Sequence, residues 1–172
     1  MYRRKMKIGR WALPVVLAAL LVLGFLPGCN QSSGAPAPDF SFPTTRGDTV
    51  TLSELRGQPV LVNFWSLTCG DCIVEMPHIQ AAFEEKGEEV KFVAVHLGGG
   101  TEQIRQFAEQ FGLDFIMAVD SGGQSWNRYN IRGFPVTVFV DEQGTVKHRK
   151  QGPFRNAEEI ISLLDSLFGP SA

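Results

Sequence analysis

The sequence has 172 residues, of which 44% are hydrophobic and 20% are charged. This length suits one domain, and the composition excludes intrinsic disorder and fibrous repeats. The formal net charge of -2 hides an uneven distribution, because five of the 16 basic residues lie within the first ten positions. Residues 29–172 carry 11 basic and 18 acidic residues, a net charge of -7. We therefore exclude nucleic acid as a partner, since binding it requires clustered Lys and Arg.

The first 28 residues have the layout of a secretory signal peptide, with a basic stretch before an uncharged apolar run at 11–26. As a helix this run would cover roughly 24 Å, less than the ~30 Å hydrocarbon core of a membrane. The segment LPGC at 26–29, which follows the apolar run, resembles the bacterial lipobox. Pro27 departs from the small residue that the lipobox usually has at this position. The resemblance implies lipid attachment at Cys29, and an uncleaved signal anchor is the alternative. Either alternative places the rest of the chain outside the bacterial cell membrane and anchored to it.

Residues 29–38 are expected to form a flexible tether, because NQSSGAPAP has linker composition and no periodicity. Residues 39–172 are expected to form one domain in which strands and helices alternate. In chain order, the patterns predict a strand at 60–65, a helix at 72–86, a strand at 92–97 and a helix at 101–111. Thr101 is the expected N-cap of this last helix, and Gly112 is expected to end it. There follow a strand at 115–119, a short helix at 122–129, a hairpin of strands 136–140 and 145–150, and a helix at 157–168. This order predicts an α/β fold with a sheet covered on both faces.

Cys69 and Cys72 form a C-x-x-C motif between a predicted strand and a predicted helix. Structural zinc is one alternative, but it needs two more ligands, and the sequence has neither a second cysteine pair nor histidines at ligand spacing. We therefore expect no metal here. A purely structural disulfide is another alternative, although so small a ring constrains little of the unfolded chain.

The position of the motif at a helix N-terminus indicates redox chemistry. Unsatisfied N–H groups and the helix dipole favour an anion there, so the first cysteine ionises near neutral pH. We expect Cys69 to be the attacking thiolate and Cys72, one turn inside the helix, to be the resolving thiol.

Further motifs extend from the entrance of the predicted domain to its last helix. They are APDF at 37–40, LSELRG at 52–57, NFWS at 63–66, CGDC at 69–72, EMP at 75–77 and GFP at 133–135. With these motifs, residues 36–168 resemble the thioredoxin-like, membrane-tethered thiol-disulfide oxidoreductases of the ResA/TlpA kind. The resemblance implies a three-layer fold with a central mixed sheet and helices on both faces, and an extra helix and strand at 98–119. It implies no cofactor.

The same resemblance implies roles for three more residues. In thioredoxin, a buried Asp exchanges a proton with the resolving thiol, and Asn63 occupies the position of that Asp here. Glu75 resembles the Glu that exchanges this proton in the ResA-like group. A solvated helix charge is the alternative for Glu75. The bond between Phe134 and Pro135 is implied to be cis, with the Phe134 backbone pairing with an extended substrate segment. A rigid proline that opens a strand is the alternative for Pro135.

Two positions depart from the family pattern. Thr68 replaces the Trp that usually precedes the first cysteine, so partner contacts are expected to differ. Within the pair Gly70-Asp71, which tunes the redox couple, Asp71 replaces the usual Pro. A carboxylate beside Cys69 opposes its ionisation and destabilises the reduced form. We therefore predict a reducing couple.

These observations predict an extracytoplasmic enzyme that reduces disulfides in other proteins. The resemblance implies a membrane thiol-transfer protein as its reductant and apocytochrome c as a substrate, in cytochrome c maturation. A thiol peroxidase is one alternative, but it would need Thr three residues before the nucleophile, where Ser66 stands, and an Arg partner. A copper-delivering binding protein on the same fold is another, but it would use C-x-x-x-C with a distant His.

Overall fold

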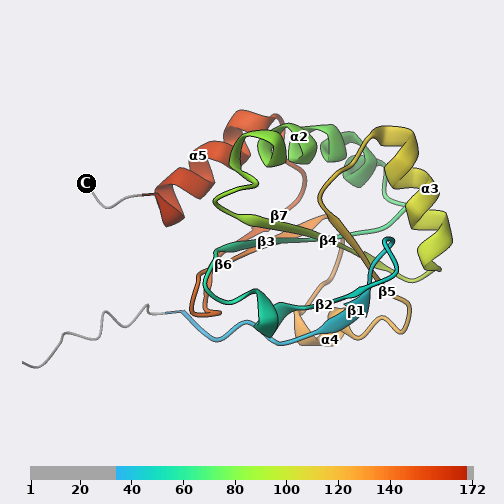
Figure 1. The fold of residues 1–172 in the computed structure, drawn as a ribbon, viewed down its shortest axis with the longest axis horizontal. Helices are drawn as coiled ribbons and strands as arrows, with labels where there is room; N and C mark the ends of the chain where they lie inside the picture. The colour runs from blue at the N-terminus through green and yellow to red at the C-terminus, as the bar shows by residue number, and fades with distance from the viewer. Residues whose placement is uncertain (1–33, 170–172) are drawn as a thin grey trace, which may run out of the picture. The chain divides into compact units, whose positions relative to one another are not determined.

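The computed structural model describes residues 34–169, so the expected signal peptide and Cys29 lie outside the described residues. A five-stranded mixed sheet with the order β5-β4-β3-β6-β7 forms the centre of the domain (Figure 1). Its strands are β3 (Val60–Trp65), β4 (Lys91–Leu97), β5 (Ile116–Asp120), β6 (Val136–Val140) and β7 (Val146–Gln151). Strands β3, β4 and β5 are parallel to one another, and β6 and β7 add antiparallel pairs. The expected mixed α/β sheet is confirmed.

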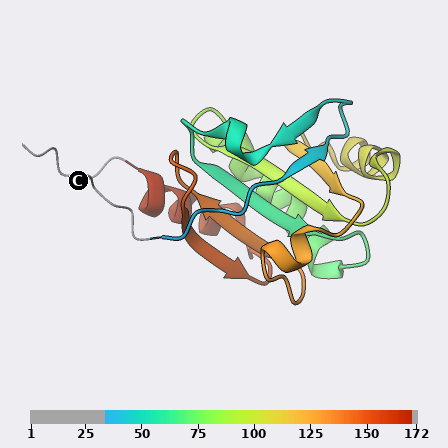
Figure 2. The ribbon, with the colours of Figure 1, turned by 90° about the horizontal axis from the view of Figure 1, so that it is seen from below.

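The two faces of the sheet are covered differently. Helices α2 (Gly70–Lys86), α3 (Thr101–Phe111) and α5 (Ala157–Phe168) lie on one face (Figure 1). The other face carries the hairpin of β1 (Ser41–Pro43) and β2 (Thr49–Thr51), the 3-10 helix η1 (Leu52–Leu55) and the short helix α4 (Ser125–Arg128). Figure 2 shows the β1–β2 hairpin and α4 lying over this other face of the sheet. The domain therefore has three layers, with a hairpin as a main part of the third.

Strand β3 lies in the middle of the sheet and is buried along its whole length. Its side chains alternate between the faces, as those of any strand do. Leu61 and Trp65 join the apolar cluster under α2, α3 and α5, whereas Val62 and Phe64 join the cluster under the β1–β2 hairpin. This burial on both faces explains the unbroken apolar run in the sequence. The alternation also places Asn63 on the helix-covered face.

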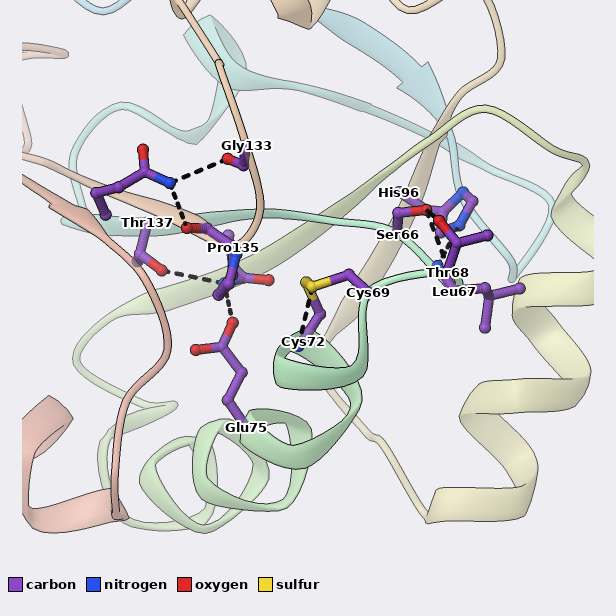
Figure 3. Close-up of a disulfide and its surroundings, with 12 residues drawn as sticks. Ser66, Leu67, Thr68, Cys69, Cys72, Glu75, His96, Gly133, Pro135 and Thr137 are labelled. Carbon is purple, nitrogen blue, oxygen red and sulfur yellow. Dashed lines mark hydrogen bonds between the residues drawn. A yellow bond between two sulfur atoms is a disulfide. The ribbon is translucent and has the colours of Figure 1, made fainter.

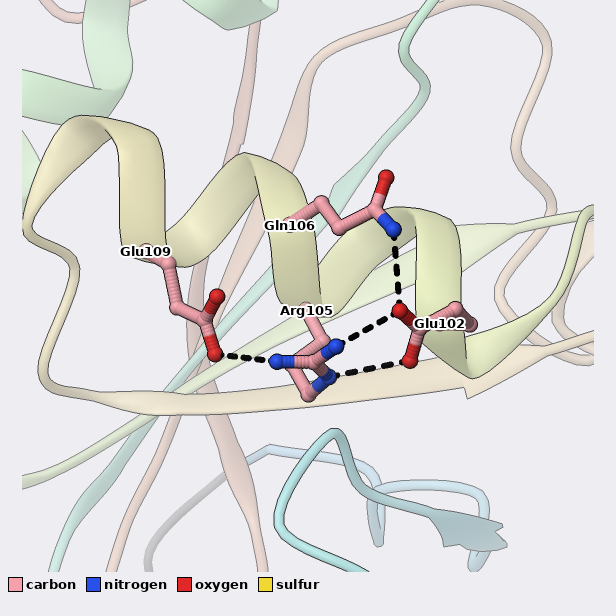
Figure 4. A network of polar contacts seen from close by, with 4 residues as sticks. All are labelled: Glu102, Arg105, Gln106 and Glu109. Carbon is pink, nitrogen blue, oxygen red and sulfur yellow. Dashed lines mark hydrogen bonds and ion pairs between the residues drawn. The ribbon is translucent and has the colours of Figure 1, made fainter.

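The expected extra helix and strand are α3 and β5. Ile104 and Phe107 of α3 are buried in the cluster beneath the helices. The solvent side of α3 carries Arg105, which pairs with Glu102 at 2.6 Å and with Glu109 (Figure 4). Exposed ion pairs contribute little to stability. The apolar face is therefore what holds α3 on the sheet.

The ends of several elements differ from the sequence-based expectations. Thr101 is not an N-cap but the first residue of α3, and Gly100 before it offers no side-chain bond. Gly112 ends α3 in the left-handed conformation, with φ of 63°, as predicted. The helix expected at 122–129 contracts to α4, because the carboxylate of Asp120 accepts the N–H groups of Gln124 and Ser125 and fixes the start there. The β1–β2 hairpin was not predicted, since three-residue strands carry too little pattern.

The described part of the expected tether is paired with the domain. The N–H of Val146 donates to the carbonyl of Ala35, and the N–H of Ala37 donates to the carbonyl of Gly144, both at 2.9 Å. Within residues 34–169, backbone pairing with the domain therefore starts at Ala35, before Asp39. Hydrogen bonds between backbone groups do not depend on the type of side chain, so the composition of this segment does not indicate them. No helix within residues 34–169 has the length and apolar character needed to cross a membrane.

Candidate active site

Cys69 and Cys72 form a disulfide where β3 leads into α2 (Figure 3). Cys69 is the N-cap residue of α2, and its Sγ accepts the N–H of Cys72 at 3.1 Å. Cys69 is partly exposed, whereas Cys72 is fully buried. Unpaired N–H groups at the helix start stabilise an anion at the exposed sulfur. The geometry thus suits Cys69 for attack on another molecule and Cys72 for attack on Cys69.

The loop before Cys69 is held by a short series of hydrogen bonds. The carbonyl of Ser66 accepts the N–H of Cys69 at 3.0 Å, and the hydroxyls of Ser66 and Thr68 are 3.0 Å apart. The N–H of Leu67 donates to Nε2 of His96 at 3.0 Å. The Ser66 hydroxyl, which stands where a peroxidase would need Thr, therefore bonds within the loop.

Glu75 lies on the buried face of α2, one turn after Cys72, with 0% of its surface exposed. Its Oε1 accepts Nδ2 of Asn63 at 2.8 Å, and its Oε2 accepts the N–H of Phe154 at 3.0 Å. Burial raises the pKa of Glu75 from 4.5 to about 7, although the two hydrogen bonds and the charge of Lys150 oppose this shift. The alternative of a solvated helix charge is wrong. A buried carboxyl group that titrates near neutral pH can exchange a proton at working pH.

Asn63 connects Glu75 to the sheet. Its Nδ2 also donates to Oγ1 of Thr137 on the adjacent strand β6, at 3.0 Å. Asn63 and Thr137 are both completely buried. The amide therefore holds the carboxyl of Glu75 at a fixed place without adding a charge to the core.

Pro135 follows a cis peptide bond with Phe134, which confirms that expectation. Figure 3 shows Pro135 facing the disulfide. Nε2 of Gln151 donates to the carbonyls of Gly133 at 3.1 Å and Pro135 at 3.3 Å, so β7 supports this loop. The ring of Phe134 lies 4.8 Å from that of Trp126, which is 39% exposed. An aromatic pair thus borders the loop, although the Trp usual before the first cysteine is absent.

The two departures from the family pattern lie on the surface. Thr68 and Asp71 are exposed on either side of Cys69, and Gly70 between the cysteines is exposed as well. The charge of Asp71 acts to raise the pKa of Glu75, which shows that its field extends into the site. The predicted tuning of the couple by Asp71 stays a prediction.

Sequence reasoning assigned no role to His96, Gln151 or Lys150. Nζ of Lys150 lies 3.0 Å from Glu159 and 5.1 Å from the centre of the Phe154 ring. These contacts join residues far apart in the chain, and no local motif indicates them. Groups of three or more His, Cys, Asp or Glu that could hold a metal are absent from the described range 34–169.

Comparison with known proteins identifies the family. The model of the AhpC/TSA family matches residues 33–149. The thiol-disulfide oxidoreductase ResA of Geobacillus kaustophilus is 35% identical over 135 residues, which are 78% of this chain and 77% of the relative. The thioredoxin-like protein YneN of Bacillus subtilis is 32% identical over 128 residues, 73% of this chain and 75% of the relative.

Solved structures similar to this chain belong to the same kind of protein. The crystal structure of StoA from Bacillus subtilis has a TM-score of 0.64 at 26% identity, covering 74% of this chain and 97% of that one. A secreted disulfide oxidoreductase of Mycobacterium tuberculosis, homologous to DsbE of E. coli, has a TM-score of 0.66 at 25% identity, covering 74% and 96%. With the C-x-x-C disulfide at the start of α2, these likenesses show that the chain belongs to the AhpC/TSA family and is a thioredoxin-like thiol-disulfide oxidoreductase of the ResA type.

Proposed function

We propose that this protein reduces disulfides in partner proteins outside the cytoplasmic membrane, with Cys69 as the attacking residue and Cys72 as the resolving residue. The observation that carries the proposal is the unequal exposure of the two sulfurs. Cys69 is partly exposed at the helix start, and Cys72 is fully buried one turn from a carboxyl group with a pKa of about 7. A partner can therefore reach one sulfur only, and the proton of the other has an acceptor inside the protein.

The reaction starts from the dithiol form. The Cys69 thiolate attacks one sulfur of the partner's disulfide, which forms a mixed disulfide and releases the partner's other sulfur as a thiolate. Cys72 then gives its proton to Glu75 and attacks the Sγ of Cys69. This breaks the mixed disulfide and releases the second partner thiolate. After both partner thiolates take up protons, the partner is a dithiol and this protein holds the Cys69–Cys72 disulfide.

Phe134 and Pro135 provide the surface for the partner. The loop that contains them faces the disulfide, and β7 supports it through Gln151. An extended partner segment can pair with the Phe134 backbone while its sulfur meets Cys69. The proposed partner is a protein with a disulfide in an accessible, extended segment.

The proposed cellular setting is cytochrome c maturation at the bacterial cell membrane. Apocytochrome c is the proposed substrate, and a membrane thiol-transfer protein is the proposed reductant. The signal-like N-terminus and the LPGC exit support this setting, as does the likeness to a disulfide oxidoreductase described as secreted. In cells fed a labelled fatty acid, the wild-type chain should carry the label and Cys29→Ala should not. An unlabelled wild-type chain that keeps residues 1–28 would instead indicate an uncleaved signal anchor.

Trapping of the mixed disulfide tests the proposed chemistry. The Cys72→Ser variant should accumulate disulfide-linked complexes with extracytoplasmic proteins that are resolved by a reducing agent, because the resolving step is blocked. Cys69→Ser is the matched control and should trap none. Equal trapping by both variants would contradict the assigned roles. Consumption of hydrogen peroxide by the reduced wild-type protein, without trapped partners, would instead favour the peroxidase alternative.

A further inference from the structure

His96 lies at the end of β4, where it pairs in register with Trp65 at the end of β3. Only 4% of its surface is exposed, and its ring packs nearly perpendicular to that of Trp65, with the planes at 81° and the centroids 4.9 Å apart. Both ring nitrogens have partners. Nδ1 is 2.7 Å from the carbonyl of Gly98, and Nε2 is 3.0 Å from the N of Leu67.

These partners fix the protonation state of the ring. A carbonyl can only accept, so Nδ1 carries the hydrogen, and a backbone N–H can only donate, so Nε2 is the acceptor. Burial also lowers the pKa of His96, which favours the neutral ring at pH 7. The turn after β4 makes this geometry possible, because Gly98 and Gly99 have φ of 91° and 72° and bring the chain back over the ring.

Leu67 belongs to the loop that positions the attacking sulfur. Two residues after it, Cys69 is held by its N–H bond to the carbonyl of Ser66, and its Sγ accepts the N–H of Cys72. In the oxidised protein the disulfide also holds Cys69 in place. Reduction removes that bond, and the loop contacts then have to keep the sulfur at the start of α2. The bond from Leu67 to His96 ties this loop to the neighbouring strand β4.

We propose that His96 is a positioning residue for Cys69: its Nε2 anchors the Leu67 amide and so keeps the attacking sulfur at the N-terminus of α2 in the reduced protein. The inference rests on the proposed role of Cys69 as the attacking sulfur. His96 does not touch the sulfur, so its effect passes through the loop. An unanchored loop lets the thiolate leave the helix N–H groups, and the thiolate then loses part of its stabilisation.

Three variants separate anchoring from packing. His96→Gln keeps an acceptor, because its Oε1 reaches about as far along the side chain as Nε2 does. His96→Phe keeps a ring in the same space but has no acceptor. His148→Phe makes the same substitution at an exposed position of β7 and serves as the control. For each protein, the alkylation rate of the reduced form is measured against pH, which gives the pKa of Cys69. Melting temperatures are recorded in parallel.

The expected result is a higher pKa of Cys69 in His96→Phe, with an alkylation rate at pH 7 that is lower by about three- to tenfold, the equivalent of one lost hydrogen bond. His96→Gln should stay within about twofold of wild type, and His148→Phe should match it. An unchanged pKa in His96→Phe would overturn the proposal. An equal rise in the Gln and Phe variants would also overturn it, because loss of packing would then explain both.

Hydrogen exchange in the wild-type protein gives a test that needs no variant. The amide of Leu67 should stay protected in the reduced form at pH 7, since its bond to His96 does not depend on the disulfide. Free exchange of this amide in the reduced form would contradict the anchoring role. A failure of Cys72→Ser to trap partners would refute the proposed function without changing these readings, so the two failures can be told apart.

Discussion

The amide of Asn63 donates to the carboxyl of Glu75 across 2.8 Å in the fully buried space between β3 and α2. Both N–H groups of this amide are used, because the second contact goes to Thr137. Glu75 is therefore an ionisable group held by two neutral partners, the Asn63 amide of the sheet and the N–H of Phe154 before α5. Its burial and its raised pKa have consequences that can be measured.

The stability of the oxidised protein should fall as the pH rises from 4.5 to about 7. The pKa of Glu75 is about 7 in the folded protein, above the ordinary value of 4.5, so the folded state binds its proton more tightly than the unfolded state does. The stabilisation is complete below pH 4.5 and is lost as pH rises through 7. The shift corresponds to a loss of about 3 kcal/mol in the free energy of unfolding.

Chemical denaturation of wild type and Glu75→Gln across this range measures the loss. The variant should show a flatter profile, because its side chain does not titrate. Glu85→Gln, an exposed change on the same helix, should follow the wild type. Parallel profiles for wild type and Glu75→Gln would rule out Glu75 as the source of the slope.

Lys150→Met should shift the pH dependence of disulfide exchange to higher pH. The positive charge of Lys150 lowers the pKa of Glu75, so its removal leaves the carboxyl protonated at pH values where it would otherwise accept the proton of Cys72. The rate at which a preformed mixed disulfide with a model peptide is resolved measures this step. Lys91→Met, at the far end of β4, is the control and should leave the profile in place.

Asp71→Asn should raise the reduction potential. Without the carboxylate beside Cys69, the thiolate is more stable, so the reduced form gains stability. Because Asp71 is exposed, a shift of about 10 to 20 mV is expected, and it should shrink in high salt. Equilibration with glutathione redox buffers measures both proteins. The wild type should lie well below the value of about -120 mV of a strong oxidant, and a value near that figure would refute the predicted reducing couple.

Gln151→Ala should weaken substrate binding while the chemistry of the thiol is unchanged. The lost side chain donates to the carbonyls of Gly133 and Pro135, and its removal loosens the loop opposite the disulfide. We expect KM for a disulfide protein to rise about threefold, the equivalent of one exposed hydrogen bond. The alkylation rate of Cys69 should stay constant. If the alkylation rate of Cys69 falls while KM rises, Gln151 would instead be needed to position the cysteines. Gln143→Ala, in the distant hairpin turn, is the control.

The sequence predicts the central elements well because their signal is local. The structure has the predicted bounds for the strands 60–65 and 136–140 and for the helix 157–168. A buried strand or helix face requires apolar residues in a continuous or periodic pattern, and this pattern is visible in the sequence. The cysteine motif likewise needs only four consecutive residues. Contacts between residues far apart in the sequence produce no such local pattern. Leu67 and His96 are 29 positions apart, and Glu75 and Phe154 are 79 apart. The burial of Glu75 could be expected only through resemblance to a family.

The pairing of Ala35 and Ala37 with the β6–β7 hairpin determines where the chain enters the domain. That hairpin lies at the end of the sheet where β3 begins, because β6 is antiparallel to β3 and pairs Val140 with Val60. Cys69 follows the other end of β3, roughly 20 Å further along the strand. Residues 35–37 therefore join the domain at the end of the sheet remote from the sulfurs. A protein substrate that approaches Cys69 does not have to displace this entering segment.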